Sequence, residues 1–308
     1  MIIVQYQPEL IEQTVLLAAR RDAKTEVDLH RAIDPMFELP QDDEREARFR
    51  RAFVEWFARL KLDRFVDELL SHFPRVAEQV AEAVVRAAPR SKSEGAELFV
   101  RDGADGCRRT LVVQVLPESL VEPDLVRDAM LRELQHAEDM LDETFGYVPE
   151  SIDGLPSQQQ VVRDRYGVLW RIRVEAALVR PGLLDGSGES RLRSQFEQTF
   201  TLAGVAPPAG AFSSLWNGTA VTHAQLLSWA SDPRAWLHRT DDRCSSKVLG
   251  APCPTCRFPT FDWFEDTDSR DDDFVTRVRQ SAPAWTQDQG ICRQCAETFL
   301  SISASPAS

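Results

Sequence analysis

The sequence of 308 residues lacks several signatures of common protein classes. No segment approaches the roughly 20 apolar residues that a membrane-spanning helix needs. The N-terminus, Met1-Ile-Ile-Val-Gln-Tyr, lacks the basic region, apolar run and cleavage site of a signal peptide. The chain also has no Gly-rich phosphate loop, no Gly-x-Ser-x-Gly elbow and no internal repeat. We therefore expect a cytoplasmic protein without a membrane partner.

Positive charge is also scarce in this chain. Its 36 Lys and Arg residues stand against 49 Asp and Glu residues, which gives a formal net charge of −13. From Asp262 to Asp273 alone there are seven acids and a single Arg. This balance opposes the attraction to phosphates that dominates nucleic-acid affinity, so we expect no nucleic-acid partner. A composition of 43% hydrophobic and 28% charged residues is typical of a globular protein.

The most informative residues are four of the six cysteines, which form two identical short pairs. These pairs are Cys253-Pro-Thr-Cys256 and Cys292-Arg-Gln-Cys295. In a Cys-x-x-Cys turn, both thiolates can point to one side at a separation that suits a tetrahedral ion. Two such turns supply four sulfur ligands, and the spacing therefore predicts a structural Zn²⁺ site.

This part of the chain, about residues 247 to 308, resembles the zinc-ribbon family. The Cys-Pro-x-Cys knuckle carries the resemblance, although Arg257 stands where that family often has Gly. The resemblance implies a fold held together by the metal, but it does not imply one kind of partner. The 35 residues between the knuckles hold enough apolar side chains for a small sheet: Phe258, Phe261, Trp263, Phe264, Phe274, Val275 and Trp285.

Two alternatives for the cysteines stay open. The pairs can be dithiols that cycle between oxidised and reduced forms, or Cys244 can replace one of the four ligands. Cys107 and Cys244 have no partner at a metal-type spacing, which agrees with a reducing compartment.

Residues 8–89 show helical periodicity. One stripe consists of Phe49, Phe53, Trp56 and Leu60, and the next of Phe65, Leu69 and Phe73. Beyond a Ser/Lys/Gly stretch, Leu98-Phe-Val-Arg and Leu111-Val-Val-Gln-Val flank a turn-rich loop and predict a β-hairpin.

Further helices are predicted after the hairpin. Capping boxes beginning at Ser157 and Thr222 indicate two of them. The sequence thus predicts a mostly helical α+β protein. It would comprise a helical region at 1–92, an α+β region with further helices at 93–245, and a zinc ribbon at 246–308.

A central helix is predicted from about Pro123 to Phe145, with Gly146 as its stop. At about 100° per residue, its core face consists of Val126, Met130, Leu134, Ala137 and Leu141. Glu133 and His136 then lie on one flank of that face, one turn apart. A carboxylate and an imidazole at this spacing can meet a common ion or proton.

The segment Arg132-Glu133-Leu134-Gln135-His136 resembles the His-Glu-x-x-His helix of zincin metallopeptidases, and the resemblance extends over residues 97–146. It implies that Glu133 occupies the general-base position and His136 the second zinc-ligand position. Arg132 takes the place of the first His, and a guanidinium has no lone pair for a metal. The Met-turn of one zincin branch is also absent, since no Met follows Met140.

Three interpretations of this helix stay open: an ordinary structural helix, a zincin-derived helix without its chemistry, and a working metal site completed by distant residues. The other imidazoles, at His30, His72, His223 and His238, are isolated in sequence. We therefore expect a zinc-binding protein with an inactive zincin-like core that acts through a protein partner. The alternative is a zinc-dependent metallopeptidase or related hydrolase with Glu133 as general base.

Overall fold

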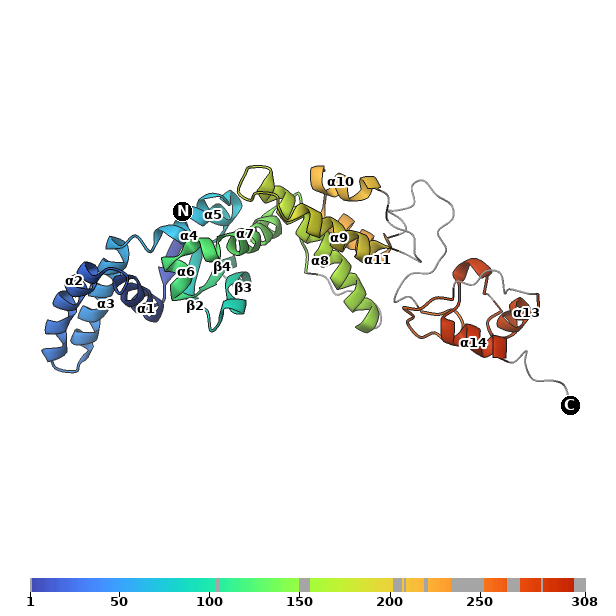
Figure 1. The fold of residues 1–308 in the computed structure, drawn as a ribbon, viewed down its shortest axis with the longest axis horizontal. Helices are drawn as coiled ribbons and strands as arrows, with labels where there is room; N and C mark the ends of the chain where they lie inside the picture. The colour runs from blue at the N-terminus through green and yellow to red at the C-terminus, as the bar shows by residue number, and fades with distance from the viewer. Residues whose placement is uncertain are drawn as a thin grey trace. The chain divides into compact units, whose positions relative to one another are not determined.

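The computed structural model describes residues 2–103, 106–149, 156–201, 207, 209–218, 221–233, 252–264, 272–283 and 285–301. As predicted, the protein is a mostly helical α+β chain, and its described residues contain a four-stranded sheet (Figure 1). It divides into two compact units. The first consists of residues 1–143 and 177–184, and the second of residues 144–176 and 185–308. The predicted domain boundaries at residues 92 and 245 rest on changes in the sequence pattern, which this division into units does not test, so they stay a prediction.

The first unit contains the sheet, whose strands follow the order β1-β2-β4-β3. β1 and β4 pair in parallel with β2, whereas β3 and β4 form an antiparallel hairpin. The predicted hairpin is therefore confirmed. The strands are β1 (Ile3–Tyr6), β2 (Glu82–Ala87), β3 (Gly95–Gly103) and β4 (Gly106–Val115).

One face of the sheet is buried. Ala83 and Val85 of β2 lie opposite Leu111 and Val113 of β4, and all four are buried. Alternate residues of a strand point to the same face, so these side chains form one apolar surface that the helices cover. α7 lies against β3, and α1 contacts β2.

The helices of this unit occupy most of the chain before the hairpin. They are α1 (Pro8–Ala19), α2 (Ala23–Ile33), η1 (Asp34–Glu38), α3 (Asp43–Arg59), α4 (Arg64–Ser71) and α5 (Pro74–Gln79). After β2 and β4 come the short segments η2 (Ser91–Ser93), α6 (Pro117–Val121) and η3 (Pro123–Leu125), and then α7 (Arg127–Leu141). α1 packs against both α3 and α6.

The prediction that residues 8–89 are helical throughout is wrong at its C-terminal end, where β2 is a strand. The segment Glu82-Ala-Val-Val-Arg-Ala fits either period over so short a length. This segment forms a strand because it pairs with β1 on one side and with β4 on the other. β1 itself precedes the helical pattern, and the sequence analysis does not predict it.

The predicted core face of the central helix is confirmed, because Val126, Met130, Leu134, Ala137 and Leu141 are all buried. The predicted ends are wrong. α7 begins at Arg127, after the separate turn η3, and ends at Leu141, with Asp142 in an extended conformation.

The second unit holds α8 (Pro156–Val179, to Ala176 in this unit), α9 (Glu189–Phe200), α10 (Ala209–Asn217) and α11 (His223–Ser231). The capping box of Thr222 and Gln225 is confirmed. α8 begins at Pro156, so Ser157 is its second residue and not the predicted cap. His223 is buried, and its Nδ1 lies 2.7 Å from the Tyr166 hydroxyl.

The cysteine-rich segment of the second unit contains α13 (Asp272–Ser281), η4 (Gln287–Gln289) and α14 (Arg293–Ser301). Within residues 252–264, 272–283 and 285–301, the only β-pairing consists of two isolated bridges, so the predicted small sheet is wrong there. Phe274 and Val278 lie one turn apart on α13, and both are buried. Phe258 and Phe261, which the sequence analysis counts among the apolar side chains for that sheet, are exposed.

No helix in the described part of the chain combines the length and the apolar character that spanning a membrane requires.

Candidate metal centre

The first cysteine pair lies in a tight turn. The Cys253 N–H donates to the Phe258 carbonyl, and the Arg257 N–H donates to the Cys253 carbonyl, each over 2.8 Å. A bridge between Pro252 and Pro259 closes the turn. Arg257 adopts a positive φ of 64°, in the left-handed region that favours glycine. A tight turn is thus present here despite the Arg at this position.

The second pair begins immediately before α14 and ends in its first turn. A bridge to Trp263 holds Cys292, and the Arg293 side chain pairs with Asp262 over 2.8 Å. The Cys295 N–H donates to the Cys292 Sγ over 3.4 Å. The Cys292 sulfur therefore caps the N-terminus of α14. This hydrogen bond favours the charged form of the Cys292 thiol, but burial outweighs it and raises the pKa of Cys292.

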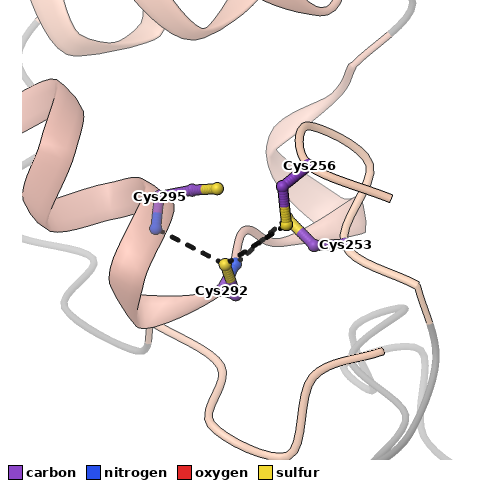
Figure 2. A group of neighbouring side chains, drawn as sticks. All are labelled: Cys253, Cys256, Cys292 and Cys295. Atoms are coloured by element: carbon purple, nitrogen blue, oxygen red, sulfur yellow. Dashed lines mark hydrogen bonds between the residues drawn. The ribbon is translucent and has the colours of Figure 1, made fainter. Parts of the chain in front are cut away.

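All four sulfur atoms converge (Figure 2), and we call this group the four-cysteine centre. The Sγ atoms of Cys253, Cys256, Cys292 and Cys295 lie within 4.8 Å of one another. Metal–sulfur bonds of about 2.3 Å in a tetrahedron place sulfurs about 3.8 Å apart. The distance between the Sγ atoms of Cys256 and Cys292 is 3.9 Å. Four convergent thiols, none of them in a disulfide, are a donor set that can hold a metal ion.

A compact apolar cluster surrounds the centre. Cys253 and Cys292 are buried, together with Phe264, Phe274, Val278, Trp285, Ile291 and Ala296. The Trp285 indole N–H donates to the Gly290 carbonyl over 2.7 Å, which satisfies the polar atom of the largest ring in the cluster. The ligands and the core of this segment are therefore one structure, because Cys253 and Cys292 belong to both.

Hydrogen bonds to sulfur link the two pairs directly. The Cys292 N–H donates to the Cys253 Sγ over 3.5 Å. Burial opposes ionisation of the Cys253 thiol, but backbone N–H groups outweigh that effect and lower its pKa to about 7. Burial raises the pKa of both Cys292 and Cys295, and the neighbouring thiols raise it further. The Cys253 sulfur thus ionises more readily than those of Cys292 and Cys295, which need a nearby cation to ionise.

These pKa shifts predict a steep pH dependence of metal affinity. A bound ion requires thiolates, whereas Cys292 and Cys295 are protonated at neutral pH in the metal-free site. We expect metal binding at pH 7 to release more than about two protons, and the affinity to fall as the pH is lowered. Isothermal titration calorimetry in two buffers of different ionisation enthalpy measures the protons released. A release near zero would contradict this prediction.

The positive φ of Arg257 predicts a stabilising substitution. Arg257→Gly removes a side chain from a left-handed conformation, and we expect it to stabilise the folded segment by about 1 kcal/mol. Competition with a chromophoric zinc chelator measures the resulting gain in metal affinity. Lys61→Gly is the matched control, because Lys61 has a φ of 61° but lies in the first unit. Equal metal affinities for the two variants would contradict the argument.

The residues that the structure describes do not assemble a comparable site around the central helix. Glu133 is exposed and His136 is half-buried on α7, with Arg132 in the same turn. Among the described residues, the only group of three or more potential metal ligands is the four-cysteine centre. Neither Glu133 nor His136 belongs to it.

No histidine in the described part of the chain belongs to the four-cysteine centre. Cys244 and His238 lie outside the described residues, so the interpretation with Cys244 as a ligand stays untested. The side chain of Cys107 is also outside them. His30 pairs with Asp34 at 3.6 Å, and His72 is exposed at the end of α4.

The sequence does not predict that Glu138, an acid on α7, is buried. The helical context of Glu138 favours a solvated charge, but its side chain is buried. Its carboxylate accepts from the backbone N–H groups of Arg75 and Val76, at 3.2 and 3.0 Å, and from the Arg75 guanidinium at 3.1 Å. Glu138 therefore satisfies the N-terminus of α5 from a distant helix. Only the fold brings these residues together, so no local pattern reveals the contact.

No protein-family model, curated protein or solved structure matches this chain. The resemblances to zinc ribbons and to zincins thus depend on the residues themselves.

Proposed function

We propose that this chain is a cytoplasmic zinc-binding protein, in which the four-cysteine centre holds one structural zinc ion and the remainder acts by binding a protein partner. The convergence of four thiols within 4.8 Å is the observation that carries the proposal. Four protein ligands complete a tetrahedral zinc site, which leaves no position for water or substrate. The zinc would therefore stabilise the fold and would not take part in catalysis.

The identity of the metal follows from the donors. Thiolates are soft ligands, and a closed set of four in tetrahedral arrangement is typical of structural zinc. Iron–sulfur centres also use four thiolates, so the metal must be measured. Cys253 and Cys292 belong both to the ligand set and to the apolar cluster. This supports a role of the zinc in folding, as in a zinc ribbon.

The central helix fits a zincin-like core that has lost its chemistry. Arg132 holds the position of the first zincin ligand, and its positive charge opposes a dication. Glu133 is exposed, so it lacks the enclosed setting in which a general base acts beside a metal-bound water. Both observations disfavour the alternative of a metallopeptidase with Glu133 as base.

Metal stoichiometry tests the proposal. We expect native mass spectrometry of protein purified without added metal to show one zinc ion per chain. Two zinc ions per chain would support the metallopeptidase instead, because the second would need a site outside the four-cysteine centre. A chain without metal that forms disulfides between Cys253 and Cys256 would favour the redox dithiols.

A further inference from the structure

A groove in the first unit lies far along the sequence from the cysteines. It is formed by α1, α2 with η1, and α3, which pack beside one another (Figure 1). Its volume is about 960 Å³, at the upper end of the range for ligand sites. All of its lining residues belong to residues 6–55, so the groove needs no other part of the chain.

The floor of the groove is apolar. Ile11, Ile33 and Phe53 are buried beneath it, whereas Phe37 and Val54 present large apolar surfaces to solvent. Phe37 is 59% exposed and Val54 is 50% exposed. Exposed apolar side chains above a continuous apolar floor are typical of a surface that a partner covers.

The rim of the groove is acidic. Five carboxylates line it, against two guanidinium groups and one imidazole: Glu9, Glu12, Asp34, Glu46 and Glu55 against Arg50, Arg51 and His30. Asp34 pairs with His30 at 3.6 Å. Within the described part of the chain, the other four acids make no ion pair. A ligand with positive charge therefore finds four carboxylates that make no ion pair with any described residue. We call this feature the acidic groove.

We propose that the acidic groove binds a basic amphipathic helix of a partner protein. An apolar floor takes the apolar stripe of such a helix, and the rim carboxylates pair with Lys or Arg on its flanks. The same charges repel nucleic acid and anionic membranes. They also disfavour a second copy of this chain, whose net charge is −13. This inference rests on the protein-interaction role proposed above and names the class of partner.

A designed peptide provides the probe. It has about 18 residues, long enough for five helical turns, with Leu at helical positions i, i+3, i+4 and i+7 and Lys at most others. It carries a fluorescent label. One control peptide replaces every Lys with Glu, and another has the same composition in scrambled order. We expect fluorescence anisotropy to show binding of the Lys peptide alone to the full-length protein, with an affinity that falls as salt is added.

Two double variants locate the binding. Phe37→Ala with Val54→Ala removes the exposed apolar contacts, and we expect the Kd of the Lys peptide to rise at least about tenfold. Phe99→Ala with Val27→Ala is the matched control, because these side chains are 50% and 55% exposed and do not line the groove. We expect this control to change the Kd less than about twofold.

A second pair of variants tests the charges. Glu12→Gln with Glu55→Gln should raise the Kd about three- to tenfold at low salt and should flatten its salt dependence. Glu78→Gln with Glu97→Gln removes the same charge from exposed positions outside the groove and should leave both unchanged.

Several outcomes would overturn the proposal. One is equal binding of the Lys and Glu peptides, and another is an equal effect of the groove variants and their controls. Self-association that the Phe37/Val54 variant abolishes would identify a second copy as the occupant instead. Zinc content is measured in every variant. Peptide binding without zinc would refute the zinc proposal alone, and zinc without peptide binding would refute only the groove.

Discussion

Cys253→Ser is expected to abolish binding of the zinc ion that we propose for the four-cysteine centre and to unfold residues 252–301. Structural zinc contributes on the order of 10 kcal/mol to such small domains, which exceeds the stability that their cores supply. The loss should be large here, because Cys253 is fully buried and its sulfur accepts the N–H of Cys292. Native mass spectrometry reports the metal, and hydrogen exchange reports the unfolding.

Control variants make this result specific. Cys295→Ser should behave like Cys253→Ser, whereas Cys107→Ser and Cys244→Ser should keep the full zinc content. Residues 2–143 should keep their exchange protection in the Cys253 and Cys295 variants, because they belong to the first unit and these cysteines belong to the second. If Cys244→Ser loses zinc while Cys295→Ser retains it, the ligand set is wrong.

Glu138→Ala is expected to destabilise the first unit by about 3 kcal/mol. The substitution leaves the Arg75 and Val76 N–H groups without their acceptor at the buried start of α5. It also removes a buried carboxylate from the Arg75 guanidinium. Urea denaturation followed by circular dichroism measures the free energy of unfolding, and hydrogen exchange should show the loss of protection concentrated in α5.

Glu143→Ala is the matched control for this variant. Glu143 lies just beyond the end of α7 but is exposed, so its removal should change the free energy of unfolding by less than about 0.5 kcal/mol. A similar cost for both substitutions would mean that Glu138 contributes through general charge and not through its contacts with α5.

The features that the sequence predicts correctly are local ones. Both knuckles of the four-cysteine centre are four-residue motifs, and their spacing alone places two sulfurs on one side of a turn. The buried face of α7 follows from a single period over 15 residues. The hairpin of β3 and β4 joins strands that are neighbours in sequence.

The features that it misses depend on residues far apart in the chain. β2 becomes a strand because β1 and β4 pair with it from both sides, although its six residues suit a helix as well. Glu138 is recognisable as a capping acid only after α5 lies beside α7. Between the knuckles, aromatic content indicates a core but does not distinguish a sheet from α13. Likewise, the sequence does not show that Phe274 is buried and Phe258 exposed, because burial depends on the fold.

The sheet order also constrains the sequence of events during folding. β1 is the first element of the chain, yet its partner β2 begins only at Glu82, after five intervening α-helices. β2 also pairs with β4, which is synthesised later still. Helices α1 to α5 therefore emerge before the sheet that organises them, and closing these long loops costs entropy before any strand pairing repays it. The rate-limiting step of folding in the first unit should thus be the docking of β1 and β4 onto β2.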